Sequence, residues 1–195
     1  PTSGHIYVGG QDITALRAGQ LSKFRRERLG FVFQDSNLLD TLTARENIAL
    51  ALTINRAPAK EVPARVTGVA QRLGVADVLD KFPHEMSGGQ KQRVAAARAI
   101  VADPSLVLAD EPTGALDSRN SRLLLESLED LNNAGATIIM VTHDSFAASY
   151  ARRALFLKDG RVWNELVRGT KTRKTFFNEI MDVVSFLGGE GADVR

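Results

Sequence analysis

The chain has 195 residues, which suits one domain or one domain with a small subdomain. Hydrophobic residues make up 44% and charged residues 25%, and a formal net charge of only +2 gives no sign of the basic face typical of nucleic-acid binding. The sequence has no Cys, which excludes a disulfide framework and a thiolate metal site, and no apolar run is long enough to span a bilayer.

The first half of the chain predicts short strands followed by a block of helices. We expect strands over 5–8 and 29–34, and helices from Thr43 onward and over 63–73. Thr43 with Glu46 three residues later is the pattern of a capping box, and Gly74 is well placed to end the second helix. We interpret residues from about 35 to 100 as a helical subdomain.

From Ser87 onward, apolar strands alternate with helices. The expected elements are helices over 90–101, 118–133, 146–150 and 172–187, strands over 106–109 and 137–142, and a hairpin of 153–158 with 161–166. In helix 118–133 the side chains predicted to share one face are Leu123, Leu124, Leu128 and Leu131. This alternation predicts an α/β fold with a mainly parallel sheet.

Two adjacent carboxylates, Asp110 and Glu111, follow the apolar strand 106–109. In a parallel sheet, ligands gather at the carboxyl ends of the strands. A carboxylate there can hold the water shell of Mg²⁺, and its neighbour can deprotonate an attacking water. A strand that ends in a solvated acidic turn gives the same pattern, so these residues alone leave both interpretations open.

A glycine-led helix start precedes the Ala-rich helix, in the order Ser87, Gly88, Gly89 and Gln90. Ser87 can cap the helix, and the glycines let the backbone approach a ligand closely. The positive potential of a helix N-terminus favours an anion. An ordinary capped helix needs only the serine, so the two glycines favour an anion-binding turn.

Three further features are weak when each is taken alone. Gln34 ends a strand, Asp117 closes the stretch 114–117, and His143 follows the strand 137–142. A solvated glutamine, an ordinary helix cap and a loop histidine would each look the same. Their joint occurrence in one order with the two motifs above is what changes the interpretation.

In this order the motifs resemble those of ABC-type ATPase domains. The matches are Gln34 to the Q-loop, 86–90 (MSGGQ) to the signature with Met86 where Leu is commonest, 106–110 to Walker B, Glu111 to the catalytic Glu, 114–117 to the D-loop and His143 to the switch His. The resemblance implies a P-loop NTPase-like (RecA-like) α/β fold with an α-helical subdomain.

The resemblance also implies hydrolysis of ATP with Mg²⁺. Asp110 would hold the Mg²⁺ shell, and Glu111 would act as general base on the attacking water. Gln34 would contact Mg²⁺ or that water and report to a membrane partner. His143 would hydrogen-bond the γ-phosphate and hold the transition state.

A homodimer that sandwiches two ATP molecules is implied as well. Ser87 and Gly89 would contact the γ-phosphate of ATP bound by the other subunit, with Gly88 and Gln90 in the same cofactor-binding turn. Asp117 would organise the opposite site. The implied partner is a transmembrane permease subunit, which would place the chain at the cytoplasmic face of the cell membrane, and no nucleic-acid partner is expected.

The stretch 111–117 (EPTGALD) resembles the group that serves lipoprotein-release, macrolide-export and antimicrobial-peptide-resistance transporters. Similarity to the bacitracin-resistance type lies in 141–144, 147–150 and 156–160, and in the tail with Phe176, Phe177, Ile180 and 187–189. The implied function is export or detoxification of a substrate such as an antimicrobial peptide or a lipoprotein. The groove beside Gln34 and the helical block from Thr43, next to Leu38 and Leu39, is expected to receive a cytoplasmic helix of the permease.

No stretch of the chain fits the P-loop pattern G-x-x-x-x-G-K-[ST]. We expect this loop to lie upstream of Pro1, so that the 195 residues form a partial domain. The amides and Lys of a P-loop hold the β- and γ-phosphates. The chain as given is therefore expected to bind ATP weakly and to hydrolyse it barely.

Two other functions are alternatives. One is an ABC ATPase that acts on nucleic acid or ribosomes, although the coiled coils, zinc insertions or second cassette usual in such proteins do not appear between Gln34 and Ser87. The other is a catalytically silent interaction module. Glu111 and His143 argue against it, because docking alone needs neither residue.

Overall fold

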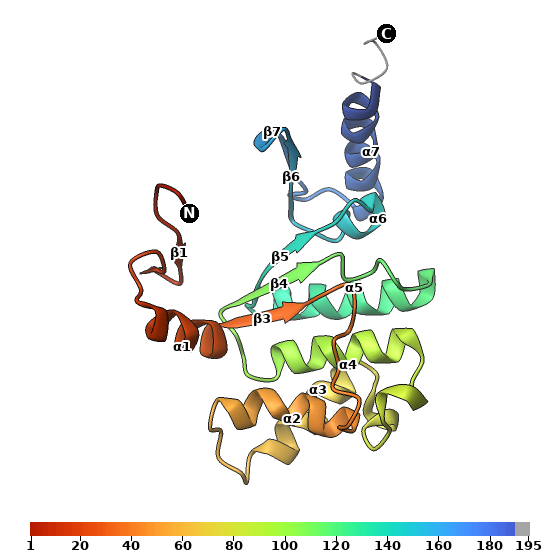
Figure 1. The fold of residues 1–195 in the computed structure, drawn as a ribbon. Coiled ribbons are helices and arrows are strands. Elements are labelled where there is room, and N and C mark those ends of the chain that lie inside the picture. The colour runs from red at the N-terminus through yellow and green to blue at the C-terminus, as the bar shows by residue number, and fades with distance from the viewer. Residues whose placement is uncertain (190–195) are drawn as a thin grey trace. The chain divides into compact units, whose positions relative to one another are not determined.

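A computed structural model describes residues 1–189 of the chain (Figure 1). The elements in chain order are β1 (Tyr7–Val8), β2 (Gln11–Asp12), α1 (Ala18–Arg28), β3 (Leu29–Val32), α2 (Ala44–Ile54), α3 (Val62–Arg72), 3-10 turns at Ala76–Val78 and Pro83–Glu85, α4 (Gly88–Ile100), β4 (Leu106–Asp110), α5 (Ser118–Asn133), β5 (Thr137–Val141), α6 (Ser145–Ala148), β6 (Arg153–Lys158), β7 (Arg161–Val167) and α7 (Arg173–Gly189). Contacts divide the chain into two compact units, residues 1–141 and residues from 142 onward.

The sheet of the first unit is parallel, with strand order β3-β4-β5. Phe31 of β3 is in register with Leu108 of β4, which is in register with Ile139 of β5. The intervening helices α4 and α5 make the crossovers that parallel strands require. The predicted α/β fold with a parallel sheet is confirmed.

The two faces of this sheet differ in exposure. On one face Val32, Val107 and Ala109 are buried in the main hydrophobic cluster together with residues of α2, α3, α4 and α5. Figure 1 shows α4 and α5 running along that face. On the other face Phe31 and Ile139 stay 37% and 53% exposed.

Helix α4 packs tightly against β3. A Cβ on Gly30 would overlap the carbonyl oxygen of Ala99, so only glycine allows the two backbones to come this close. Further along, the Gln92 side-chain amide donates a hydrogen bond to the Phe33 carbonyl. Gly30, near the start of β3, lies against the end of α4, whereas Phe33, just after β3, lies against the start of α4. Helix α4 therefore runs antiparallel to β3.

The predicted capping box at Thr43 is confirmed. Thr43 accepts a hydrogen bond from the Glu46 backbone N–H at 3.3 Å, and the Glu46 carboxylate accepts one from the Thr43 backbone N–H at 2.8 Å. The block 35–100 lies within the first unit, and its delimitation as a subdomain stays a prediction.

Helix α5 matches the predicted range, but one of its core residues was assigned wrongly. Leu123 is 41% exposed, whereas Leu125 is buried at 1%. The buried stripe runs through Ser121, Leu124, Leu125, Leu128 and Leu131. This is the 3-and-4 spacing of one helical face, and Leu123 falls outside it.

The sequence did not predict α1. Its only buried residue is Phe24, and its last turn carries Arg25, Arg26 and Arg28. A helix that buries one side chain has no apolar stripe, so no periodicity marks it.

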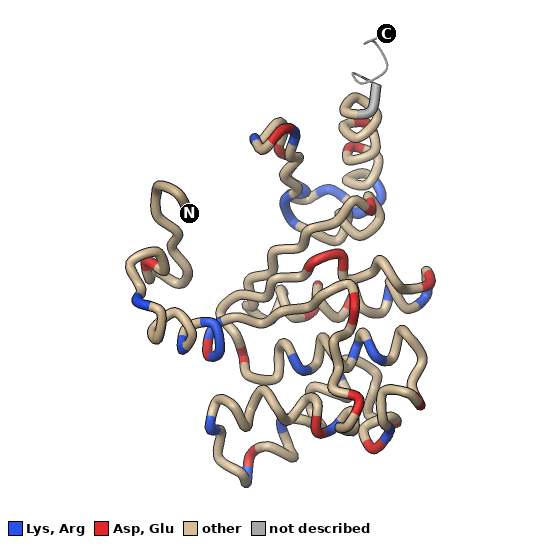
Figure 2. The backbone as a smooth tube through the Cα atoms, viewed as in Figure 1, with Lys and Arg blue, Asp and Glu red and all other residues tan. Residues whose placement is uncertain are grey.

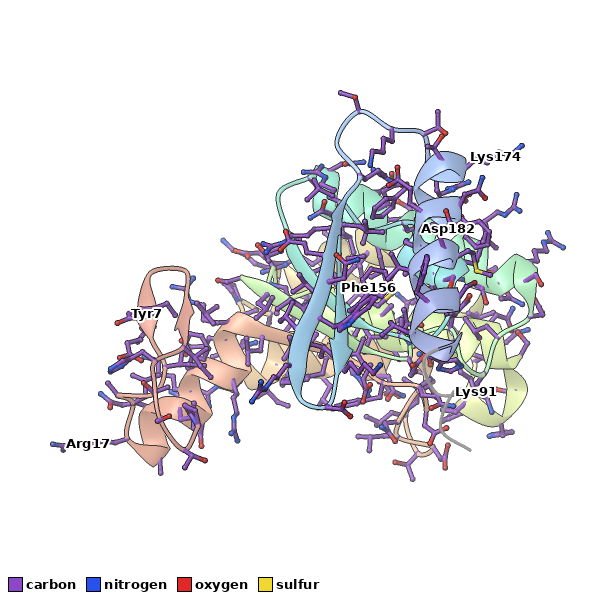
Figure 3. All side chains as sticks on the ribbon, turned by 90° about the horizontal axis from the view of Figure 1, so that it is seen from above. Tyr7, Arg17, Lys91, Phe156, Lys174 and Asp182 are labelled. Atoms are coloured by element: carbon purple, nitrogen blue, oxygen red, sulfur yellow. The ribbon has the colours of Figure 1, made fainter. Side chains whose placement is uncertain are left out.

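The second unit contains the predicted hairpin of β6 and β7, turned by Asp159 and Gly160, which both have positive φ angles of 52° and 74°. Helix α7 buries Phe176 and Ile180. Figure 3 draws the described side chains and labels Phe156 on β6 and Asp182 on α7. Among residues 1–189, no helix has the length and apolar character needed to cross a membrane.

Candidate functional site

The acidic pair lies where β4 ends. Asp110 is its last residue and is exposed. Glu111 has a φ of 44°, in the left-handed region that costs a non-glycine residue about 1–3 kcal/mol. Its backbone N–H donates to the Val141 carbonyl at 2.9 Å, and its own carbonyl accepts from Gly114 N–H at 3.0 Å. Among the described residues the same left-handed conformation occurs at Asn37, Arg56, Asp103 and Asp159, so the catalytic interpretation of the pair stays a prediction.

Gln34 reaches the same edge of the sheet. It follows β3 by two residues, and β3 lies parallel to β4, so both chain segments leave the sheet on the same side. A Cβ on Gly114 would lie 3.1 Å from Gln34 Nε2, which places the Gln34 amide against the D-loop. Figure 2 shows acidic positions where β3 and β4 end. The structure thus brings Gln34, Asp110, Glu111 and the D-loop to one edge.

The signature turn is a complete capping box. Ser87 Oγ accepts from the Gln90 backbone N–H at 3.3 Å, and Gln90 Oε1 accepts from the Ser87 backbone N–H at 2.9 Å. The interpretation of this turn as a helix cap is therefore confirmed, and anion binding at the same turn stays a prediction. Because α4 runs antiparallel to β3, its N-terminus lies beyond the carboxyl end of β3, on the side of Gln34.

The two glycines of this turn have different surroundings. A Cβ on Gly88 would meet nothing within 4 Å, whereas one on Gly89 would lie 2.8 Å from Asn120 Nδ2. Gly88 is exposed and Gly89 is buried. Gly89 is therefore needed for packing against α5, a reason that the sequence did not reveal.

Asp117 caps helix α5. Its Oδ1 accepts from the Asn120 backbone N–H at 2.8 Å and its Oδ2 from Asn120 Nδ2 at 2.7 Å. These hydrogen bonds from Asn120 lower the pKa of Asp117 below its ordinary value of 3.8, so the carboxylate is ionised at neutral pH. Asn120 Oδ1 in turn accepts from Arg93 Nη1 of α4 at 2.6 Å.

His143 belongs to the second unit and follows β5 by two residues. The next residue, Asp144, caps α6 by accepting from the Phe146 backbone N–H at 2.8 Å, and its own N–H donates to Thr142 Oγ1 at 3.0 Å. These bonds order the loop that carries His143. The proximity of His143 to the carboxylates of the first unit stays a prediction.

Comparison with known proteins decides the family. A family profile described as "ABC transporter" matches residues 1–114. The chain is 49% identical over 189 residues to the bacitracin export ATP-binding protein BceA of Halalkalibacterium halodurans, and the aligned region covers 96% of this chain and 75% of BceA. This chain belongs to the ABC transporter family. It is also 48% identical over its whole length to the ABC transporter ATP-binding protein YxdL of Bacillus subtilis, covering 76% of that protein.

A solved ABC cassette has the same fold. The dimeric post-hydrolysis structure of the ATP-binding cassette MJ0796, bound to ADP and Pi, superposes with a TM-score of 0.77 at 38% identity, over 86% of this chain and 74% of that one. The RecA-like α/β fold predicted from the motifs is thereby confirmed. As an ABC transporter ATP-binding domain, the chain is the ATPase part of a transporter.

Three polar residues of α4 make contacts near the candidate site that the sequence did not predict. Gln92 holds the Phe33 carbonyl next to the Q-loop residue, and Arg98 donates to the Ser36 and Asn37 carbonyls at 3.1 and 2.8 Å. Arg93 holds Asn120. Arg93 stands four residues after Gly89, and this i,i+4 spacing was the available signal that both share one helical face.

Proposed function

We propose that this ABC ATPase works as a homodimer with Mg²⁺ and ATP and powers export through a partner permease. The observation that carries the proposal is the shared edge of the parallel sheet, where the Q-loop, the acidic pair and the D-loop meet beside the N-terminus of α4. This arrangement supplies carboxylates for a metal and a water, and a positive helix end for phosphate.

On the acidic side, Asp110 and Gln34 would hold the Mg²⁺ shell through oxygen atoms. Within residues 1–189 no group of three or more His, Asp or Glu could hold a metal ion by itself. A site with one or two protein ligands suits Mg²⁺, because this ion keeps its waters and binds nucleotide phosphates. Glu111 would take a proton from the attacking water, and His143 would hydrogen-bond the γ-phosphate.

On the signature side, the turn that holds Ser87, Gly88, Gly89 and Gln90 would meet the γ-phosphate of ATP bound by the other subunit. The exposure of Ser87 and Gly88 at the start of α4 supports this role, as does the positive potential of a long helix at its N-terminus. Asp117 would organise the opposite site. The relative MJ0796 is described as a dimeric structure, which supports a two-subunit assembly here.

The permease would dock on the first unit beside the Q-loop and hold the chain at the cytoplasmic face of the membrane. A groove of about 250 Å³ between α1, α2, α4 and β3 is lined by apolar residues that include Phe31, Phe33 and Ile54 and by the charged Arg25, Arg26 and Arg98, while Gln34, Leu38 and Leu39 lie outside its lining. Leu39, after the Q-loop, is 46% exposed. A cysteine at Leu39 should crosslink to the permease in the assembled transporter, and its failure to do so would remove this docking surface.

The substrate we propose is an antimicrobial peptide of the bacitracin type. BceA, the relative that is 49% identical to this chain, carries bacitracin export in its name. Disrupting the gene should raise sensitivity to bacitracin. A defect in lipoprotein release with unchanged bacitracin sensitivity would contradict this substrate and indicate a lipoprotein instead.

The catalytic proposal is tested on the complete subunit, as its gene encodes it, by measuring phosphate release with Mg²⁺-ATP. Glu111→Gln should lower turnover about 100-fold or more, since it removes the general base but keeps the shape of the side chain. Chelating Mg²⁺ should abolish turnover. Light scattering should show that the same variant still forms dimers with ATP. A wild-type rate in Glu111→Gln would show that Glu111 is not the base.

A further inference from the structure

A chain of polar side chains connects the signature helix to the D-loop. Arg93 of α4 donates through Nη1 to Asn120 Oδ1 at 2.6 Å, and Asn120 donates through Nδ2 to Asp117 Oδ2 at 2.7 Å. The Asn120 backbone N–H donates to the other Asp117 oxygen at 2.8 Å. Asn120 therefore uses its amide oxygen toward one helix and its amide nitrogen toward the D-loop.

The Arg93 end of this bridge is buried where α4 and α5 meet, and the Asp117 end is exposed. Arg93 is only 8% exposed, and Asn120 packs against Gly89 so closely that a Cβ on Gly89 would overlap it. Burial lowers the pKa of the Arg93 guanidinium below its ordinary value, against the opposing effect of Asp77 and Asp117. Hydrogen bonds in which one partner is ionised, such as those of Arg93 and Asp117 here, are shorter and stronger than bonds between neutral groups.

The bridge joins the signature helix to the D-loop, and in the proposed dimer each subunit presents its signature turn and its D-loop to the other subunit. At one end Ser87 caps α4 two residues before Gly89, and at the other Asp117 caps α5. We propose that Asn120 is a positioning residue that fixes the D-loop to the signature turn, so that both reach the partner subunit's nucleotide site as one rigid element. This inference rests on the proposed function.

The chemistry of position 120 follows from its two bonds. It needs an acceptor toward Arg93 and a donor toward Asp117 in the same short side chain. Alanine provides neither. Aspartate accepts from Arg93 but places a second carboxylate against Asp117, and serine keeps one donor and one acceptor in a smaller side chain.

The experiment compares Asn120→Ala, Asn120→Asp and Asn120→Ser in the complete subunit, with Arg122→Ala, an exposed residue of the same helix, as the control. The readouts are melting temperature, ATP binding by the monomer, ATP-dependent dimerisation in a Glu111→Gln background, and turnover. The Ala and Asp variants should bind ATP as monomers normally but dimerise weakly, and turnover should fall about ten-fold or more, because small misplacements of reacting groups are costly.

Two comparisons separate positioning from simple destabilisation. Asn120→Ser should recover part of the turnover that Asn120→Ala loses, and adding Arg93→Gln to Asn120→Ala should cost little more, because both changes break the same bridge. Normal dimerisation and turnover in the Ala and Asp variants, or losses that only follow the melting temperature, would overturn the inference. An unmodified subunit that neither dimerises nor hydrolyses ATP would instead overturn the proposed function.

Discussion

Gly88 and Gly89 stand side by side in the signature turn, yet only the second is sterically required within the subunit. Asn120 occupies the space beside Gly89, and nothing lies within 4 Å of a Cβ on Gly88. Asn120 cannot move away freely, because Arg93 and Asp117 both hold it. If Gly89 also contacts the nucleotide as proposed, position 89 tolerates fewer substitutions than packing alone would allow.

The glycine pair gives a matched prediction. Gly89→Ala should lower the free energy of unfolding by about 1–3 kcal/mol through overpacking against Asn120. Gly88→Ala should leave the stability unchanged or raise it by about 0.4–1 kcal/mol, because alanine restricts the unfolded chain. Urea unfolding of the complete subunit measures both. Equal losses in the two variants would contradict the close contact at Gly89.

Glu111 gives a second prediction at this scale, since its φ of 44° is unfavourable for any residue with a Cβ. Glu111→Gly and Glu111→Ala both remove the carboxylate and should both abolish turnover. The glycine variant should be about 1 kcal/mol more stable than the alanine variant, because only glycine adopts this conformation without strain. Thermal unfolding of the pair checks this, and a more stable alanine variant would argue against the left-handed turn.

At the scale of elements, helices are fixed at their starts by side-chain caps. Thr43 and Glu46 cap α2, Ser87 and Gln90 cap α4, and Asp117 caps α5. In α2 the hydrogen bond from the Thr43 backbone N–H, followed by that from its hydroxyl, lowers the pKa of Glu46 below its ordinary value of 4.5. The ionised carboxylate is therefore favoured in the folded state.

This shift makes the cap of α2 sensitive to acid. A carboxyl group with a lowered folded pKa contributes stability above its unfolded value, and the contribution is lost as the pH falls through the folded pKa. The stability difference between wild type and Glu46→Gln should thus be largest near neutral pH and shrink below about pH 4.5. Glu61→Gln is the control, because Glu61 makes no capping hydrogen bond with its side chain. A difference that does not change with pH would contradict the capping box.

Among the elements, those with long periodic patterns were predictable and those without were not. The strand before Asp110 and the helix 118–133 follow from apolar runs and spacing, and the structure confirms both. Helix α1 was missed because it buries only Phe24. Leu123 was misplaced because four leucines in a short stretch allow more than one apolar face.

For the whole first unit, the motifs predicted candidate site residues whose roles stay predictions, and the parallel sheet explains why Gln34, Asp110 and Glu111 lie at one edge. What the sequence could not predict are contacts between distant segments. The bond between Arg93 and Asn120 joins positions 27 residues apart, and nothing in the local pattern of either helix specifies it. The backbone of Glu111 likewise depends on its bond to Val141 of the neighbouring strand.

In the proposed dimer, one ATP is held by the acidic edge of one subunit and the signature turn of the other. In a two-fold dimer, a subunit with Glu111→Gln and a subunit with Ser87→Arg then combine to leave one intact site in each mixed dimer. Either variant alone should be inactive.

Mixing the two inactive variants in equal amounts and measuring phosphate release is therefore the most direct test. If Glu111 and Ser87 act on the same nucleotide from different subunits, the mixture should regain activity, up to about a quarter of the wild-type rate for random pairing. A mixture that stays as inactive as its components, while mixed dimers are shown to form, would contradict the account.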